Sequence, residues 1–156
     1  MTITVEERHT DKAALADMVL RALSDWFGIE EATQDDIDAA DRLPMLAARR
    51  DDKSIGFTSL EIVTPGTINI HAIGVLPDHH GSGAGRALIA ATIDRCRQQN
   101  VRLLTVKTLS DASDDPFHAG TRQFYTAMGF APAAEIPDLY DPRNPCLVMA
   151  RMVDRI

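Results

Sequence analysis

The amino-acid sequence predicts a mixed α/β fold of the α+β type, with a mostly antiparallel central sheet of about seven strands flanked by about four helices. Three observations predict it. Seven short segments are apolar or alternate with a period of two, three others carry apolar residues at helical spacing while a fourth, acidic one begins with a capping pattern, and a glycine-rich segment joins a strand to a helix. An apolar strand follows that helix, which predicts one parallel, right-handed strand-helix-strand crossover.

The first half of the chain is predicted to form a strand, two helices and a three-stranded meander. Ile3–Glu7 alternates as a strand, and Thr10 or Asp11 can cap the helix whose apolar positions are Leu15, Met18, Val19, Ala22 and Trp26. A second helix is predicted to begin at Thr33 as cap, with Asp36 completing an approximate capping box. The meander strands are Met45–Arg50, Ser54–Val63 and Thr67–Leu76.

The second half is predicted to contain two helices and three strands. The helix Ala84–Gln99 buries Leu88, Ile89, Thr92, Ile93 and Cys96, and Val101–Leu109 returns as an apolar strand. Pro116 begins the last helix and Gly129 ends it, with Phe117, Thr121, Phe124 and Met128 on one face. Ala131–Glu135 and Cys146–Val153 complete the sheet, and Asp138–Pro145 is predicted as a polar loop.

Residues Val75–Arg86, which read V-L-P-D-H-H-G-S-G-A-G-R, predict an anion-binding turn. Gly81, Gly83 and Gly85 allow positive φ and close approach of a ligand to the backbone. The first N–H groups of the following helix lack intrahelical partners, and the helix dipole favours phosphate there. The cation of Arg86 in the first helical turn would interact unfavourably with that dipole, at a cost of about 0.3–1 kcal/mol, which indicates a compensating anion. The alternative is a glycine-rich turn without a ligand.

The spacing of this turn excludes two phosphate-binding motifs and matches a third. A dinucleotide fingerprint would need glycine in place of Arg86, and the Gly-Lys-Ser/Thr of a Walker loop is absent. The segment His80–Gly85 resembles the Arg/Gln-x-x-Gly-x-Gly/Ala loop of the GNAT superfamily of N-acetyltransferases, except that His80 replaces Arg or Gln. The resemblance implies acetyl-CoA as cosubstrate, without a metal, bound by Ile73, Gly74, Val75, His80, Gly81, Ser82, Gly83, Ala84, Gly85 and Arg86.

A second segment is also similar to GNAT enzymes. Residues 121–130 read T-R-Q-F-Y-T-A-M-G-F, like the family helix whose tyrosine is the usual proton donor, which implies that Tyr125 is the general acid. Asn144–Met149 and Trp26–Ile29 resemble segments of one GNAT subgroup of unassigned substrate. Tyr125 is expected at the edge of the core with its hydroxyl in the cleft. The alternative is an ordinary boundary tyrosine.

The general base is harder to assign. The resemblance implies that strand Ile68–Leu76 supplies oxyanion-stabilising N–H groups and that Asn69 occupies the position where many relatives have glutamate. Asparagine cannot accept a proton, so His71, expected on the same strand face, is the candidate substitute. A hydrogen-bonded core histidine, the acidic residues Glu30, Glu31 and Glu61, and an amine that arrives neutral are the alternatives.

Composition restricts the partners. At 156 residues the chain, residues 1–156, suits a single domain, and the acidic start has neither a signal sequence nor a membrane span, so a cytoplasmic location is expected. The net charge of −7 argues against nucleic acid, and against a modifier of charged transfer RNA, and favours a cationic acceptor. Cys96 and Cys146 are expected as core residues.

The expected acceptor is therefore a small-molecule or peptide amine, bound near Trp26, Glu30, Glu31 and Asn69 and near the loop Asp138–Pro145. The sequence leaves open whether the protein is a homodimer. A catalytically silent acyl-CoA-binding or sensory module is the alternative function.

Overall fold

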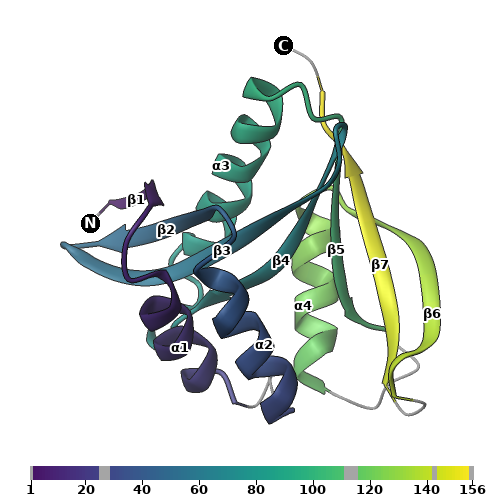
Figure 1. The fold of residues 1–156 in the computed structure, drawn as a ribbon, viewed down its shortest axis with the longest axis horizontal. Helices are drawn as coiled ribbons and strands as arrows, with labels where there is room; N and C mark the ends of the chain where they lie inside the picture. Colours follow the sequence, from purple (N-terminus) through teal and green to yellow (C-terminus); the bar gives the residue numbers. More distant parts are fainter. Residues whose placement is uncertain (1, 25–28, 111–115, 142–143, 155–156) are drawn as a thin grey trace. The chain divides into compact units, whose positions relative to one another are not determined.

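The computed structural model describes residues 2–24, 29–110, 116–141 and 144–154 of the chain, and it confirms the predicted fold class (Figure 1). Seven strands form one sheet in the order β1-β2-β3-β4-β5-β7-β6, with one parallel pair, β4 and β5. The elements in chain order are β1 Ile3–Arg8, α1 Lys12–Ala22, α2 Glu30–Ala40, β2 Met45–Arg50, β3 Lys53–Thr64, β4 Thr67–Val75, the short 3-10 helix Pro77–His79, α3 Ala84–Gln98, β5 Leu103–Leu109, α4 Pro116–Ala127, β6 Ala131–Asp141 and β7 Asn144–Met152.

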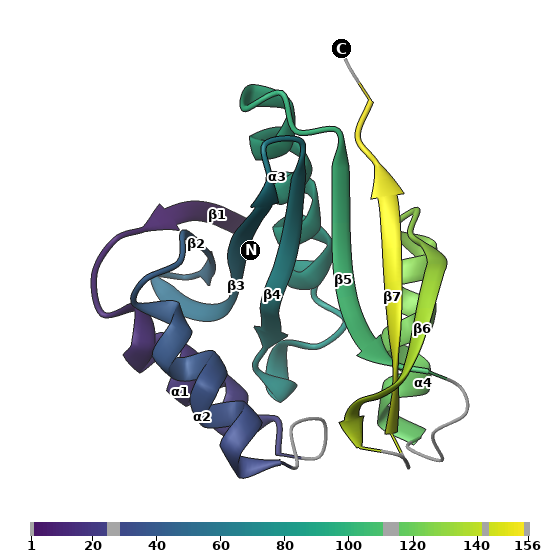
Figure 2. The same cartoon turned by 45° about the vertical axis from the view of Figure 1, so that its right-hand side comes forward.

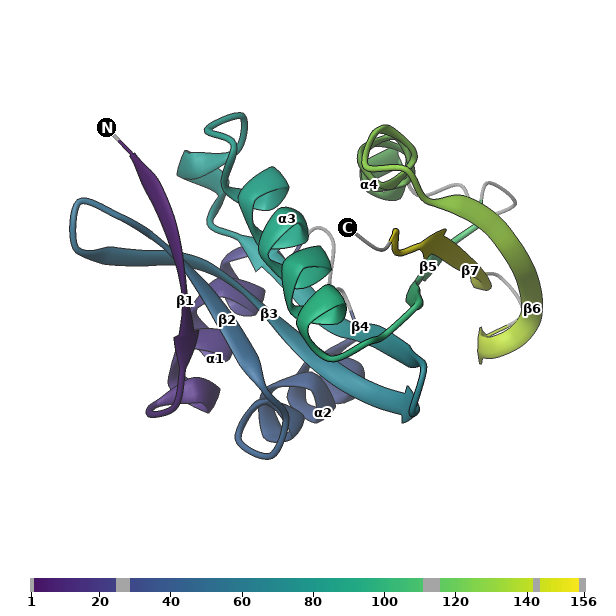
Figure 3. The ribbon, with the colours of Figure 1, turned by 90° about the horizontal axis from the view of Figure 1, so that it is seen from above.

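The chain forms two compact units, of which the first comprises Met1–Glu61 and Ile70–Arg95 and the second comprises Ile62–Asn69 and Cys96–Ile156. In the first unit, β1 pairs antiparallel with β2, and β2 with β3, where the register shifts between Ala48 and Arg49. Asp51 and Asp52 both have positive φ, of 52° and 66°, and thereby make the tight turn between β2 and β3. Helices α1 and α2 lie side by side (Figure 2). Seen from above, they cover the face of these strands opposite to α3 (Figure 3).

Helix α1 buries a face rotated from the predicted one. The buried positions are Leu15, Ala16, Val19, Leu20 and Leu23, and they pack with Ile37, Met45 and Phe57 in the core of the first unit. Met18, predicted as a core residue, is 46% exposed, and Ala22 is exposed as well. Asp11 is the N-cap residue, as one of the two predicted, but its side chain makes no capping hydrogen bond. Trp26 lies outside the described residues.

Helix α2 begins one turn earlier than predicted, at Glu30 instead of Thr33. Glu30 and Glu31 occupy the first turn, where acidic side chains interact favourably with the helix dipole. Thr33 is buried inside the helix, and its hydroxyl donates to the carbonyl of Ile29 at 3.2 Å instead of capping. Asp36 therefore lies in the middle of α2, which changes what its carboxylate can reach.

In the second unit, β7 pairs antiparallel with both β5 and β6. The segment predicted as the loop Asp138–Pro145 is mostly strand, because β6 extends to Asp141 and β7 begins at Asn144. After a register shift that follows Ile136, the two strands pair again at Asp141 and Asn144. The buried face of α4 is centred on Tyr125 and Met128, whereas Phe124 and Thr121 are only partly buried. The side chain of Phe117 lies outside the described part. Arg151 donates to the carbonyl of Met128 and so holds the end of α4.

We expect Gly56→Ala to destabilise the protein by about 1–3 kcal/mol, because a Cβ at this position would lie 2.7 Å from the carbonyl oxygen of Gly74 and 3.1 Å from a methyl group of Val75. The measurement is urea unfolding. Gly66→Ala is the matched control, since nothing lies within 4 Å of its Cβ position, and its change should stay within about 0.5 kcal/mol. Equal effects of the two variants would contradict the close approach of β3 and β4 at Gly56.

Candidate cofactor loop and catalytic residues

The turn between β4 and α3 has the backbone geometry that the glycine pattern predicts at two of its three glycines. Gly81 and Gly83 have φ values of 78° and 91°, which side-chain-bearing residues rarely adopt. Nothing lies within 4 Å of the position of a Cβ at either residue, so this backbone is open to a ligand. The expectation of positive φ at Gly85 is wrong, because Gly85 already lies in the first turn of α3.

The N-terminus of α3 offers unpaired donors beside these glycines. The carbonyl of Gly83 accepts the first helical hydrogen bond, from the N–H of Ala87 at 2.9 Å, and the hydroxyl of Ser82 accepts from the N–H of Ala84 at 3.3 Å. In the described part of the chain, the N–H groups of Gly85 and Arg86 donate to no backbone carbonyl, as expected for a first helical turn. The arrangement can hold an anion such as a phosphate.

The side chain of His80 ties the loop to the end of β4. Its Nε2 lies 2.7 Å from the carbonyl oxygen of Val75, and because a carbonyl only accepts, Nε2 carries the hydrogen. Ser82 closes the turn from the other side, since its N–H donates to the carbonyl of His79 at 3.2 Å. The sequence indicated His80 only as a cofactor-binding residue and did not reveal this structural role, which depends on the folded turn.

Three residues predicted to bind the cofactor, Ile73, Gly74 and Val75, are at the end of β4, directly before the loop. Ile73 and Val75 are partly buried, whereas Gly74 is buried against α1. A Cβ on Gly74 would lie 2.9 Å from a methyl group of Val19 and 3.0 Å from one of Leu23. Gly74 is thus required for packing against α1, and its assigned role in binding the cofactor stays a prediction.

His71 is neither a core histidine nor freely exposed, because it lies beside an acidic residue of α2. Its Nε2 is 3.2 Å from Oδ1 of Asp36, and the two side chains are 26% and 23% exposed. This is ion-pair distance, although the angles are not those of a hydrogen bond. The interaction with the Asp36 carboxylate raises the pKa of His71 above 6.5, more than burial lowers it. The sequence pattern missed this pairing because it placed Asp36 at a helix cap.

Asn69 is only 4% exposed, and its Oδ1 accepts a hydrogen bond from the hydroxyl of Thr105 on β5 at 2.9 Å. The amide is therefore fixed within the second unit. Its assignment to substrate binding stays a prediction.

The expectation that Tyr125 lies at the edge of the core is wrong, because its side chain is 4% exposed. Its ring lies 5.5 Å from that of Phe124 and 5.6 Å from that of Phe130, in tilted and edge-to-face contacts. Burial raises the pKa of Tyr125 far above the ordinary value of 10, so the hydroxyl keeps its proton throughout the neutral range. Its role as an acid stays a prediction.

The acidic residues expected near the acceptor differ in their surroundings. Glu30 pairs with Arg21 at 2.8 Å, and this contact lowers the pKa of Glu30. Glu31 is exposed on the first turn of α2. Cys96 and Cys146 are buried thiols outside any disulfide, as expected of core residues.

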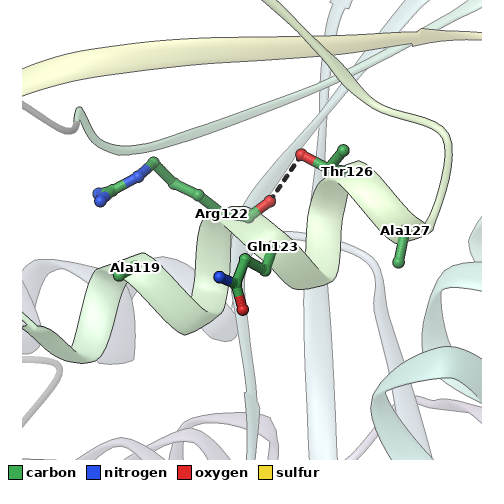
Figure 4. A pocket seen from close by; sticks show the side chains of 5 residues that line it. All are labelled: Ala119, Arg122, Gln123, Thr126 and Ala127. Carbon is green, nitrogen blue, oxygen red and sulfur yellow. Dashed lines mark hydrogen bonds between the residues drawn. The ribbon is translucent and has the colours of Figure 1, made fainter.

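A shallow depression of about 480 Å³ on α4 contains none of the predicted site residues (Figure 4). It is lined by Ala119, Arg122, Gln123, Thr126 and Ala127, and inside it the hydroxyl of Thr126 donates to the carbonyl of Arg122. Among the described residues, no group of three His, Cys, Asp or Glu side chains is placed to hold a metal ion. No helix in that part of the chain has both the length and the hydrophobicity of a membrane span.

Comparison with known proteins identifies the family. Residues 13–130 match the family model described as the acetyltransferase (GNAT) family, which covers more than half of the chain. The chain therefore belongs to the GNAT acetyltransferases. No curated protein matches the sequence.

Solved structures share the fold. A GNAT-family protein from Desulfovibrio desulfuricans is 23% identical, with a TM-score of 0.82, over 98% of this chain and 100% of that one. The ribosomal-protein-S18-alanine N-acetyltransferase of Escherichia coli is 19% identical, with a TM-score of 0.77, over 99% and 96%. A Salmonella typhimurium protein solved with acetyl-CoA is 17% identical, with a TM-score of 0.73, over 100% and 96%. At these identities the likeness shows the fold alone.

The pair of His71 and Asp36 predicts a specific pH dependence of stability. Because the folded-state pKa of His71 is raised above 6.5, the pair stabilises the protein fully below the unfolded-state pKa, and this stabilisation is lost as the pH rises through the folded-state pKa. We expect Asp36→Asn to destabilise the protein by up to about 1 kcal/mol at about pH 5.5 and by much less at about pH 9, measured by urea unfolding. Asp35→Asn, an exposed neighbour on α2, is the control. An effect of Asp36→Asn that is independent of pH would contradict the ion pair.

Proposed function

We propose that this protein is an N-acetyltransferase that moves an acetyl group from acetyl-CoA to a primary amine by direct attack within a ternary complex. The observation that carries the proposal is the open turn at Gly81 and Gly83, followed by the unpaired N–H groups of Gly85 and Arg86. Membership of the acetyltransferase family supports the same conclusion.

In this proposal the pyrophosphate of acetyl-CoA binds to the turn and the first turn of α3. Oriented backbone N–H groups hold phosphate without the cost of ordering long side chains, and the exposed cation of Arg86 adds charge attraction. The binding residues are those expected from the sequence: Ile73, Gly74, Val75, His80, Gly81, Ser82, Gly83, Ala84, Gly85 and Arg86. The hydrogen bond from His80 to Val75 keeps the turn in shape for the ligand.

The reaction itself needs three functions. The amine nitrogen attacks the thioester carbon, which places negative charge on the carbonyl oxygen, and N–H groups of β4 would stabilise that oxyanion by a few kcal/mol. The new C–N bond forms as the C–S bond breaks. A base removes one proton from the amine, and an acid supplies one proton to the departing sulfur.

Tyr125 is the proposed acid. Burial raises the pKa of the Tyr125 hydroxyl, so a protonated donor is available throughout the neutral range. The same burial weakens the phenol as an acid. Proton transfer is therefore favourable only if the thiolate forms in similarly water-poor surroundings, where its own pKa is raised as well.

His71 is the proposed base. Its imidazole is partly exposed, unlike the buried Asn69, and its pKa is shifted upward toward that of the amine, which favours proton transfer.

The proposed acceptor is a small-molecule or peptide amine, and the net charge of −7 and the exposed Glu31 favour a cation. Trp26, Glu30, Asn69 and the segment Asp138–Pro145 are further proposed contacts of the acceptor. We place the enzyme in the cytoplasm, without a nucleic-acid or membrane partner.

Acetyl-CoA should raise the unfolding temperature, because a ligand at one hundred times its dissociation constant stabilises the native state by about 2.7 kcal/mol. Gly83→Glu should remain folded and lose this shift, since it places a carboxylate against the phosphates. Gly83→Ala is the matched control, because it has the same backbone strain, of about 1–2 kcal/mol, without the charge. Calorimetry measures both. A full shift in Gly83→Glu would show that the cofactor binds elsewhere.

Tyr125→Phe should lower kcat at least about tenfold while the affinity for acetyl-CoA stays nearly unchanged, because only the hydroxyl is removed from a well-packed ring. The assay follows CoA release with a panel of amines that includes polyamines, aminoglycosides and peptide N-termini. Normal turnover of Tyr125→Phe would assign the acid role to another group. Binding of acetyl-CoA without turnover of any amine by the wild type would support the silent-module alternative.

A further inference from the structure

We propose that Asp36 is a positioning residue for His71, which it holds through Nε2 so that Nδ1 is the nitrogen that takes the proton from the attacking amine. This inference rests on the proposed acetyltransferase reaction and adds to it a residue, an atom and a tautomer. Asp36 lies in the middle of α2 and His71 on β4, and both residues belong to the first unit.

The accessibility of the imidazole selects the reactive nitrogen. Nε2 of His71 is buried and lies 3.2 Å from Oδ1 of Asp36, yet the side chain as a whole is 26% exposed. Nε2 is therefore not among the exposed atoms of the side chain. In the neutral imidazole one nitrogen carries the hydrogen and the other has a free lone pair. A carboxylate only accepts, so it favours the tautomer with hydrogen on Nε2 and leaves the lone pair on Nδ1.

The charges around the ring act in the same direction. Asp36 on α2 is the largest influence, and Glu61 on β3 adds to it, so both stabilise the imidazolium that forms when Nδ1 accepts a proton. Arg42, which follows α2, opposes them, as does partial burial. The balance makes His71 more basic than a free imidazole. A more basic imidazole accepts the proton of the attacking amine at a lower cost in free energy.

The geometry also explains why a residue of α2 fulfils this role. Asp36 follows the buried Thr33 and precedes the buried Ile37, so it borders the face of the helix that packs on the protein. Its neighbours Asp35 and Asp38 are exposed, and Asp38 is bonded to Gln34 instead. A purely structural ion pair would have the same geometry, so the test needs a measurement that stability alone does not change.

The test compares Asp36→Asn, Asp35→Asn and His71→Gln by the pH profile of kcat/KM and by NMR titration of the imidazole, with ¹⁵N shifts to assign the tautomer. We expect His71→Gln to lose about a hundredfold in kcat/KM together with one ionisation of the profile. Asp36→Asn should shift that ionisation to lower pH, reduce the plateau by up to about tenfold, and lower the pKa of His71 seen by NMR. Asp35→Asn should leave all three unchanged.

Two results would overturn the role of Asp36 in an active enzyme. One is an Asp36→Asn profile whose ionisation does not move although the NMR pKa of His71 falls, which is the outcome for a structural pair. The other is a neutral ring with its hydrogen on Nδ1. A wild-type enzyme that acetylates no amine would instead refute the acetyltransferase proposal itself, so the two failures are distinguishable.

Discussion

The junction between β4 and α3 is the constraint on which the rest of the proposed site depends. The chain must leave a strand and enter a helix within a few residues while its N–H groups stay open to a ligand. Positive φ at Gly81 and Gly83 makes the turn possible, and the contact of His80 with the carbonyl of Val75 fixes its start relative to β4. Side chains on the two glycines would strain the turn. The turn therefore determines both the direction of α3 and the position of its free donors.

The close packing of β4 has a similar origin. Gly56 and Gly74 let β3 approach β4 and let α1 approach β4, because a Cβ at either position would come within 3.0 Å of a neighbouring atom. This packing fixes β4, the strand whose N–H groups are proposed to stabilise the oxyanion formed from the thioester. The same strand supplies His71, whose partner Asp36 comes from α2. The positions of the cofactor loop and of the proposed base thus both follow from how β4 is held in the first unit.

Periodicity was sufficient to predict the fold class, and glycine spacing to predict positive φ at two residues of the turn between β4 and α3, because periodicity and glycine positions can be read within single segments of the sequence. Met45–Arg50 has the predicted bounds, and Gly81 and Gly83 have the predicted φ. The errors arose where tertiary contacts decide. Thr33 could cap a helix in isolation, but burial and the acidic first turn move the start of α2 to Glu30. The pairing of His71 with Asp36 joins residues 35 positions apart, which no pattern within one segment could reveal.

The charge of the protein restricts how a polyanion can bind. With a net charge of −7, the protein as a whole repels an anionic ligand such as acetyl-CoA. Helix α2 is particularly rich in acidic residues. Attraction must therefore be local. The N–H groups at the start of α3 are fixed dipoles whose effect falls off within about one helical turn, a distance shorter than the Debye length of about 8 Å at physiological salt. Such a site can hold phosphate while the acidic remainder of the first unit attracts cations such as the proposed amine acceptor, so that opposite charges are attracted to different parts of one protein.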